Sequence, residues 1–155
     1  MKKNIIIVLL IVLIGIASVL GILLYNKEHK IIENEKQLKE LVKENVSIGE
    51  FKKKLEDAEI EIDEELDSTS SEIIGASEGK VYKIGDSTIR VYKYDLNQTG
   101  ELTVSNLKLA QESGKVKIPS LDDLEIGVIY NKGLVLINDE EFENKDKIIE
   151  IFKGL

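Results

Sequence analysis

Cysteine is absent from this sequence of 155 residues. Its absence excludes disulfide bonds, thiolate metal sites, a cysteine nucleophile and the lipid-modified cysteine that anchors bacterial lipoproteins. If the chain has a membrane anchor, that anchor must therefore be a hydrophobic helix.

Histidine is nearly absent as well, since His29 is the only one and lies in a charged segment. One histidine can neither build a zinc site from histidine ligands nor serve a catalytic triad elsewhere in the chain. The sequence also lacks a P-loop and a dinucleotide-binding fingerprint. Two Ser-x-x-Lys matches, at Ser77 and Ser105, lack the companion elements of penicillin-recognising enzymes and are attributed to chance. We therefore predict no catalytic residue, no cofactor and no enzyme activity.

Positive charge is scarce, because 29 Asp and Glu residues outnumber 21 Lys and Arg residues and give a formal net charge of -8. Lys2 and Lys3 carry two of the positive charges, so the rest of the chain carries -10. Such a chain repels the phosphate backbones of nucleic acids. Nucleic acid is therefore excluded as a partner.

The acidic residues gather in two clusters, and clusters of carboxylate oxygens can hold calcium. Neither cluster has the ligand spacing of an EF-hand loop. We interpret both as solvated surface and predict no metal site. The first contains Glu59, Glu61, Asp63, Glu64, Glu65 and Asp67, and the second contains Asp139, Glu140, Glu141, Glu143 and Asp146.

One long hydrophobic run is present, because residues 5–24 are twenty consecutive uncharged residues. As a helix rising 1.5 Å per residue, the run spans the ~30 Å hydrocarbon core of a bilayer. A cleaved signal peptide is the alternative, but its apolar region is normally only about 7 to 15 residues long. Lys2 and Lys3 precede the run, so the positive-inside rule predicts a cytoplasmic N-terminus. We expect an uncleaved, single-pass signal anchor.

The expected organisation has four parts. Residues 1–4 form a cytoplasmic N-terminus, residues 5–25 a transmembrane helix, residues 26–45 a helical stalk, and residues 46–155 an extracytoplasmic domain. The stalk is charged and has only a thin apolar stripe, as expected of a solvated spacer. A fragment that begins at Val46 is expected to fold on its own, because the apolar pattern after it has every face needed to bury one core.

Helix signals mark both ends of this domain. Ser47 followed by Glu50 forms a capping box, which predicts the first helix. Asn144 is expected to cap the last helix, and Gly154 to end it. Between them, residues 59–63 alternate as a half-exposed strand does, and the Ser-rich residues 64–71 are expected to form a loop.

Two hairpins are predicted between these helices. Gly85-Asp86 suits a two-residue turn, which would place Ile84 opposite Ser87 and Tyr82 opposite Ile89. The second hairpin is expected to turn through the three residues Asn131-Lys132-Gly133, with Gly133 left-handed. Four consecutive aliphatic residues follow, Leu134-Val135-Leu136-Ile137, which predict a central strand covered on both faces.

Residues 99–113 are ambiguous, because their apolar residues suit a helix while Leu107-Lys108-Leu109 alternates like a strand. We favour a short helix. The fold class that results is α+β, with an N-terminal transmembrane helix and helical stalk followed by a small antiparallel sheet with packed helices.

The core and turn residues of this domain resemble a known group of proteins. They are Ile74-Gly75-Ala76, Gly79, Tyr82, Ile89, Val91-Tyr92, Tyr94-Asp95, Gly133-Leu134-Val135-Leu136-Ile137, Ile148-Ile149 and Phe152. From Ser47 to the end, the chain is similar to small, uncharacterised membrane-anchored or lipid-anchored envelope proteins of AT-rich Gram-positive bacteria. Many of those carry a lipobox cysteine, which this chain lacks. The resemblance implies a place in the envelope and a compact fold, but no activity.

The leading functional hypothesis is a non-catalytic binding or interaction module of the cell membrane, with an envelope protein as a possible partner. Tyr82, Tyr92 and Tyr94 form a possible binding surface, because tyrosine joins a large contact area to a polar tip. Core packing is the alternative for all three. The alternative functions are a structural bitopic protein of an envelope or division assembly and a small hydrolase that depends on carboxylates.

Overall fold

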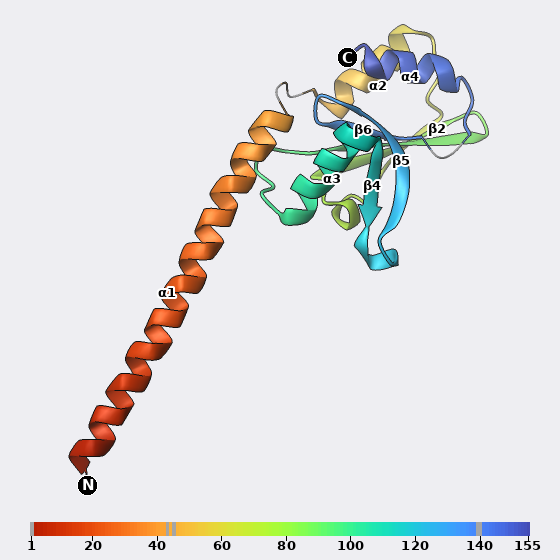
Figure 1. Ribbon diagram of the computed structural model, residues 1–155. Coiled ribbons are helices and arrows are strands. Elements are labelled where there is room, and N and C mark those ends of the chain that lie inside the picture. Colours follow the sequence, from red (N-terminus) through yellow and green to blue (C-terminus); the bar gives the residue numbers. More distant parts are fainter. Residues whose placement is uncertain (1, 43, 45, 139–140) are drawn as a thin grey trace. The chain divides into compact units, whose positions relative to one another are not determined.

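The computed structural model of the protein describes residues 2–42, 44, 46–138 and 141–155, with side chains from Gly15 onward. The chain divides into two units, Met1–Glu33 and Asn34–Leu155. Helix α1 (Lys2–Leu41) is shared between the units (Figure 1). Its residues up to Glu33 belong to the first unit, and its last turns, from Asn34, belong to the second. The other elements are α2 (Ile48–Asp57), β1 (Glu64–Asp67), the short 3-10 helix η1 (Glu72–Ile74), β2 (Glu78–Ile84), β3 (Ser87–Lys93), α3 (Glu101–Ser113), β4 (Lys115–Ile118), the short 3-10 helix η2 (Pro119–Leu121), β5 (Leu124–Asn131), β6 (Leu134–Ile137) and α4 (Lys145–Lys153).

The second unit is built on a six-stranded antiparallel sheet with the strand order β1-β2-β3-β6-β5-β4. Successive side chains of each strand point to opposite faces, so a separate hydrophobic core forms on each face of the sheet. The prediction of an α+β fold with an antiparallel sheet and packed helices is confirmed.

Helices α2 and α4 cover what we call the first face of the sheet, and they lie side by side in Figure 1. The capping box at the start of α2 is present, since the Ser47 hydroxyl accepts from the Glu50 amide at 3.1 Å. The rings of Phe51 and Phe152 meet edge to face with centroids 5.3 Å apart. Strand β6 places Leu134 and Leu136 in this core.

Helix α3 and the last turns of α1 contribute to the core on the second face. Leu38 and Val42 are buried there beside Val135. The Tyr130 hydroxyl donates a hydrogen bond to the Leu41 carbonyl. This second unit therefore begins at Asn34, earlier than the expected domain start at Val46, because the stalk supplies core residues as well as a spacer.

The first hairpin, β2–β3, has the predicted register, with Ile84 opposite Ser87 and Tyr82 opposite Ile89. In the second hairpin the prediction of a three-residue turn is wrong, because Asn131 still pairs with Leu134. Lys132 and Gly133 alone make the turn, with φ of 47° and 84°. Both residues are left-handed, as a two-residue turn of this kind requires.

The predicted strand at residues 59–63 is also wrong. Glu59 has a φ of 58° and Ile60 donates to the Leu55 carbonyl at 3.0 Å, so these residues end α2 instead of starting a strand. A strand forms directly after these residues, as β1, inside the segment expected to be a loop. It has no buried side chain and is held by pairing with β2.

Residues 99–113 form a helix over most of their length, as α3, which confirms the favoured interpretation. No helix in the described part of the chain contains a stretch long and apolar enough to cross a membrane.

Candidate functional site

An apolar hollow of the second unit forms a groove of about 480 Å³ on the second face of the sheet. Side chains of the strands form its floor, which includes Tyr92, Ile126 and Ile137. Its rims are η1, with Ile73, and the end of the β4–β5 hairpin, with Leu121. A concave, mostly apolar site of this size with a few polar groups is typical of small-molecule binding. We refer to it as the groove.

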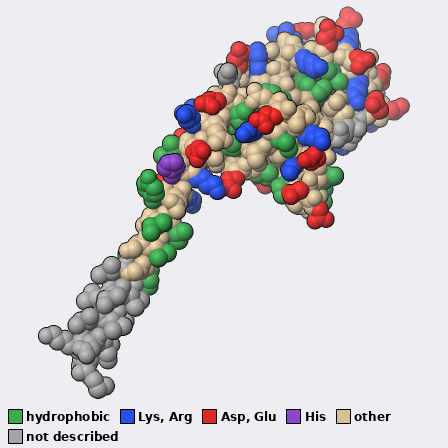
Figure 2. Space-filling model, in the orientation of Figure 1, with side chains coloured by type: hydrophobic (Ala, Val, Ile, Leu, Met, Phe, Trp, Pro, Cys, Tyr) green, Lys and Arg blue, Asp and Glu red, His purple; other side chains and the backbone are tan. Residues whose placement is uncertain are grey.

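The groove exists because helices cover only part of the second face. Helix α3 packs against β4, β5 and η1. Three large apolar side chains around the groove stay exposed, Ile73 at 42 %, Leu121 at 57 % and Leu124 at 49 %. Apolar side chains lie beside acidic ones at this end of the unit (Figure 2). Clustered apolar exposure on the rim of a hollow marks a binding surface.

Two charged residues line the groove, Arg90 and Glu125. Glu125 lies in β5 between Leu124 and Ile126, which line the groove as well. There Glu125 forms an ion pair with Lys115 at 2.9 Å, and Lys115 holds the pKa of that carboxyl below its usual value. Among the described residues that line the groove, Arg90 is the only cation.

Arg90 reaches the groove from β3, where it lies between the first-face residues Ile89 and Val91. Its register neighbours across the sheet are Val81 on β2 and, one step beyond the Val91–Leu136 pair, Ile137 on β6. The side chain is half-buried. Arg90 therefore has apolar neighbours in the sheet, and its side chain already takes part in an interaction of its own.

The rim formed by η1 is fixed by buried hydrogen bonds. The Asn106 amide donates to the Ile74 carbonyl at 2.9 Å, and the Tyr94 hydroxyl donates to the same oxygen at 3.1 Å. Thr103 Oγ1 donates to the Gly75 carbonyl at 2.8 Å. Gly75 is left-handed, and a Cβ there would lie only 2.8 Å from the Thr103 amide nitrogen. This rim is therefore pre-organised by α3.

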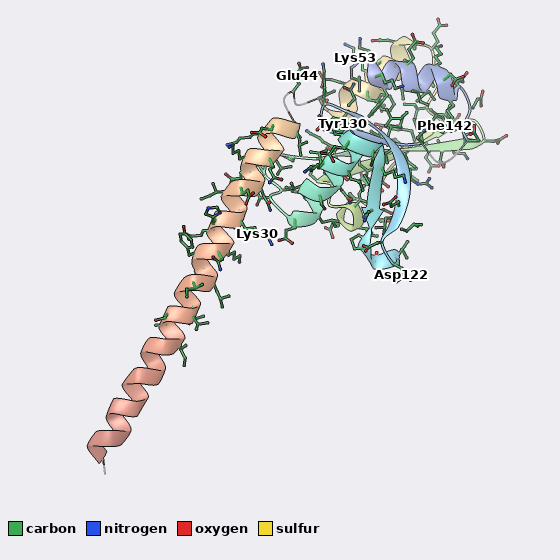
Figure 3. The ribbon with its side chains drawn as sticks, in the orientation of Figure 1. Lys30, Glu44, Lys53, Asp122, Tyr130 and Phe142 are labelled. Carbon is green, nitrogen blue, oxygen red and sulfur yellow. The ribbon has the colours of Figure 1, made fainter. Side chains whose placement is uncertain are left out.

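The opposite rim ends in a strained turn. Asp122 and Asp123 have φ of 51° and 56°, two consecutive left-handed residues that are not glycine. Figure 3 shows Asp122 at the tip of the β4–β5 hairpin. The turn holds Leu121 and Leu124 at the groove. Backbone strain of this kind is found often at ligand sites.

The three tyrosines proposed as a binding surface are core residues. Tyr82 belongs to the first-face core and Tyr92 and Tyr94 to the second-face core, so the sheet separates them. All three are at most 3 % exposed. Burial raises the pKa of the Tyr82 and Tyr94 hydroxyls. The surface hypothesis is wrong, although the ring of Tyr92 contributes to the floor of the groove.

The first acidic cluster surrounds an open hollow of about 430 Å³ between α2 and β1. Glu65 lies between two lysines, with Lys52 at 2.7 Å and Lys80 at 3.2 Å. The hydrogen bond from Lys52 lowers the pKa of Glu65, and Lys80 acts in the same direction. A general acid at neutral pH needs a raised pKa, so Glu65 does not favour the carboxylate hydrolase.

In the second acidic cluster, Asp139 and Glu140 lie outside the described residues, and Glu141 pairs with Lys145 at 3.1 Å. Within the part of the chain that the structure describes, no three acidic or histidine side chains are grouped so that they could hold a metal ion.

The two Ser-x-x-Lys serines donate to backbone carbonyls, Ser77 to Lys93 at 2.8 Å and Ser105 to Leu102 at 3.1 Å. These hydroxyls are not directed at their lysines, as a nucleophile and base would be. His29 is exposed on α1, with its ring centroid 6.1 Å from that of Tyr25.

Sequence reasoning missed the groove, because its residues come from six separate elements and share no local motif. The sequence did contain one sign that strand β3 is incompletely covered. Arg90 is the only arginine of the chain and sits in the alternating run Ile89-Arg90-Val91, where a charge is unusual for a well-covered strand.

No family model, no curated protein and no solved structure matches this chain.

Proposed function

We propose that the chain is a membrane-anchored, extracytoplasmic and non-catalytic binding module, and that the groove is its ligand site. The observation that carries the proposal is the groove itself, an apolar hollow with a strained rim on the second face of the sheet. Ile73, Leu121 and Leu124 belong to neither core and stay exposed around the groove, as the apolar residues of a binding surface do.

The anchor part of the proposal rests on the hydrophobic run at residues 5–24. The described side chains begin at Gly15 and so include only the second half of this run. In that half the large apolar residues are exposed all around α1, among them Ile16, Leu20 and Leu24 at more than half of their full area. A helix that is apolar on every side needs an apolar surrounding, which a bilayer supplies. Lys2 and Lys3 favour a cytoplasmic N-terminus.

Binding is tested with the full chain in lipid nanodiscs and a neutral apolar dye whose fluorescence rises on leaving water. Ile126→Trp fills the floor of the groove with an indole. Leu66→Trp is the matched control, because Leu66 is 52 % exposed on β1 and does not line the groove. We expect Ile126→Trp to abolish saturable dye binding and Leu66→Trp to leave it unchanged.

Empty nanodiscs give the background from dye in the bilayer. Equal binding by both variants, or no binding above that background by the parent chain, would contradict the proposal. Thermal unfolding of both variants shows that the sheet remains intact.

A further inference from the structure

The groove is small for a protein partner. Twelve of the described residues line it, whereas a stable protein interface takes about 20–30 residues from each side. The floor strands β3, β6, β5 and β4 are paired in the antiparallel ladder, so an extended peptide laid across them would find no main-chain partners. An amide buried without a partner is costly. The volume of about 480 Å³ is instead that of a small-molecule site.

The two charged residues of the groove do not call for a charged ligand. Glu125 already forms an ion pair with Lys115 at 2.9 Å, and Arg90 takes part in an interaction of its own. One carboxylate and one guanidinium also leave the lining of the groove without net charge. An ionic ligand would lose water here and meet groups whose charge is already balanced. An uncharged ligand avoids this cost.

Two serines offer neutral polar groups at the rims. Ser70 lies just before η1, and Ser120 lies in η2. A hydroxyl group both donates and accepts, so each serine can bond a hydroxyl or an ester oxygen of a ligand. The floor between the rims is largely apolar and includes Ile126 and Ile137. The groove therefore matches a molecule with a long apolar part and one neutral polar end.

We infer that the groove binds an uncharged single-chain lipid, with its aliphatic chain on the floor and its hydroxyl or ester at a rim. The inference rests on the proposed function and names the class of ligand. It also gives Glu125 a role in selectivity. Without this carboxylate, the charges of Arg90 and of Lys115, its present partner, would make the site positive and attract acidic lipids.

The test uses the full chain in zwitterionic nanodiscs and three diazirine-bearing probes of equal chain length, a hexadecanol, a palmitate and a hexadecylammonium. Mass spectrometry of the digested protein locates the labelled residues. Labelling of residues 118–126 and of η1 is divided by that of residues 5–24, which corrects for unequal entry of the probes into the bilayer. We expect hexadecanol to label the groove about tenfold more than either ion does, because each ion loses its hydration without gaining a partner.

Glu125→Gln should raise palmitate labelling of the groove to the level of hexadecanol and leave hexadecanol labelling unchanged. Glu112→Gln is the matched control, since Glu112 also pairs with a lysine, Lys108 at 3.9 Å, but does not line the groove. It should change neither signal. The preference of the parent chain among the three probes tests the inference even if a variant fails to fold.

The outcomes separate the two proposals. Groove labelling by either ion that equals or exceeds labelling by hexadecanol would overturn the uncharged lipid and leave the binding module standing. An unchanged palmitate signal in folded Glu125→Gln would overturn the charge argument in the same way. Groove labelling that falls as the protein concentration rises would mean that a second copy covers the groove, and would overturn the lipid as well. Labelling confined to α1 with all three probes would overturn both proposals.

Discussion

Asn106 is the residue on which the architecture of the groove depends most. It is 1 % exposed and joins α3 to the η1 rim and to the edge of β4 through three hydrogen bonds. Asn106→Leu keeps the volume but leaves the Lys117 amide and carbonyl without this partner. We predict a loss of about 2–4 kcal/mol in the free energy of unfolding, measured by urea denaturation.

Tyr94→Phe provides the comparison, because it removes one hydrogen bond to an Ile74 carbonyl that still accepts from Asn106. We expect it to cost only about 1 kcal/mol. If Tyr94→Phe were as damaging as Asn106→Leu, the hydrogen bonds of Asn106 would not be what fixes the rim.

Leu136 tests the prediction of a central strand. It is fully buried in β6, which lies between β3 and β5. Leu136→Ala should lower the free energy of unfolding by about 2 to 5 kcal/mol, through lost burial and the cavity left behind. Glu64→Ala, on the exposed strand β1, should change it by less than about 0.5 kcal/mol. Similar losses in the two variants would show that this assignment of the core is wrong.

Among the elements, those with strong local signals were predictable and those made by pairing were not. The β2–β3 hairpin follows from alternation and the Gly85-Asp86 turn, and α2 follows from its capping box. Strand β1 has the pattern of a polar loop and becomes a strand because β2 pairs with it. Strand β4 is four residues long and was missed for the same reason, since its place depends on β5.

The groove could not be predicted from the sequence, because its residues are distant in the chain and are apolar residues of ordinary kinds. Ile73 and Ile126 look like any other core positions. They differ only because no helix covers them where they meet. The tyrosines were misjudged for the opposite reason, since the sheet has a core on each face and buries them all.

The last turns of α1 are predicted to stabilise the second unit, whereas the sequence led us to expect a fold that starts at Val46. Leu38 is fully buried and Val42 is 4 % exposed, and Asn34 donates to the Thr99 carbonyl at 2.7 Å. A fragment beginning at Val46 lacks all three. It should be at least about 2 kcal/mol less stable than a fragment beginning at Asn34, in urea denaturation. Equal stability would mean that the last turns of α1 are dispensable.

For the whole molecule, the proposed topology predicts which parts of the chain a protease outside the cell can reach. If Lys2 and Lys3 hold the N-terminus inside, protease added to cells without their outer wall should digest the second unit. A tag placed before Lys2 should survive until the membrane is opened. Protection of the C-terminus in intact cells would contradict the proposed orientation. A mature chain that begins near Ile22 would show that the hydrophobic run is a cleaved signal peptide and not an anchor.

Binding at the groove is the central claim, and methyl NMR of the full chain in nanodiscs tests it most directly. Isoleucine methyl groups occur on both faces of the sheet, so the neutral apolar dye can be located by the resonances it shifts. We predict saturable shifts for Ile73, Ile118 and Ile126, which line the groove, and none for Ile60 and Ile148 in the first-face core. Shifts confined to the first-face core, or to Ile16 and Ile22 on α1, would contradict the account.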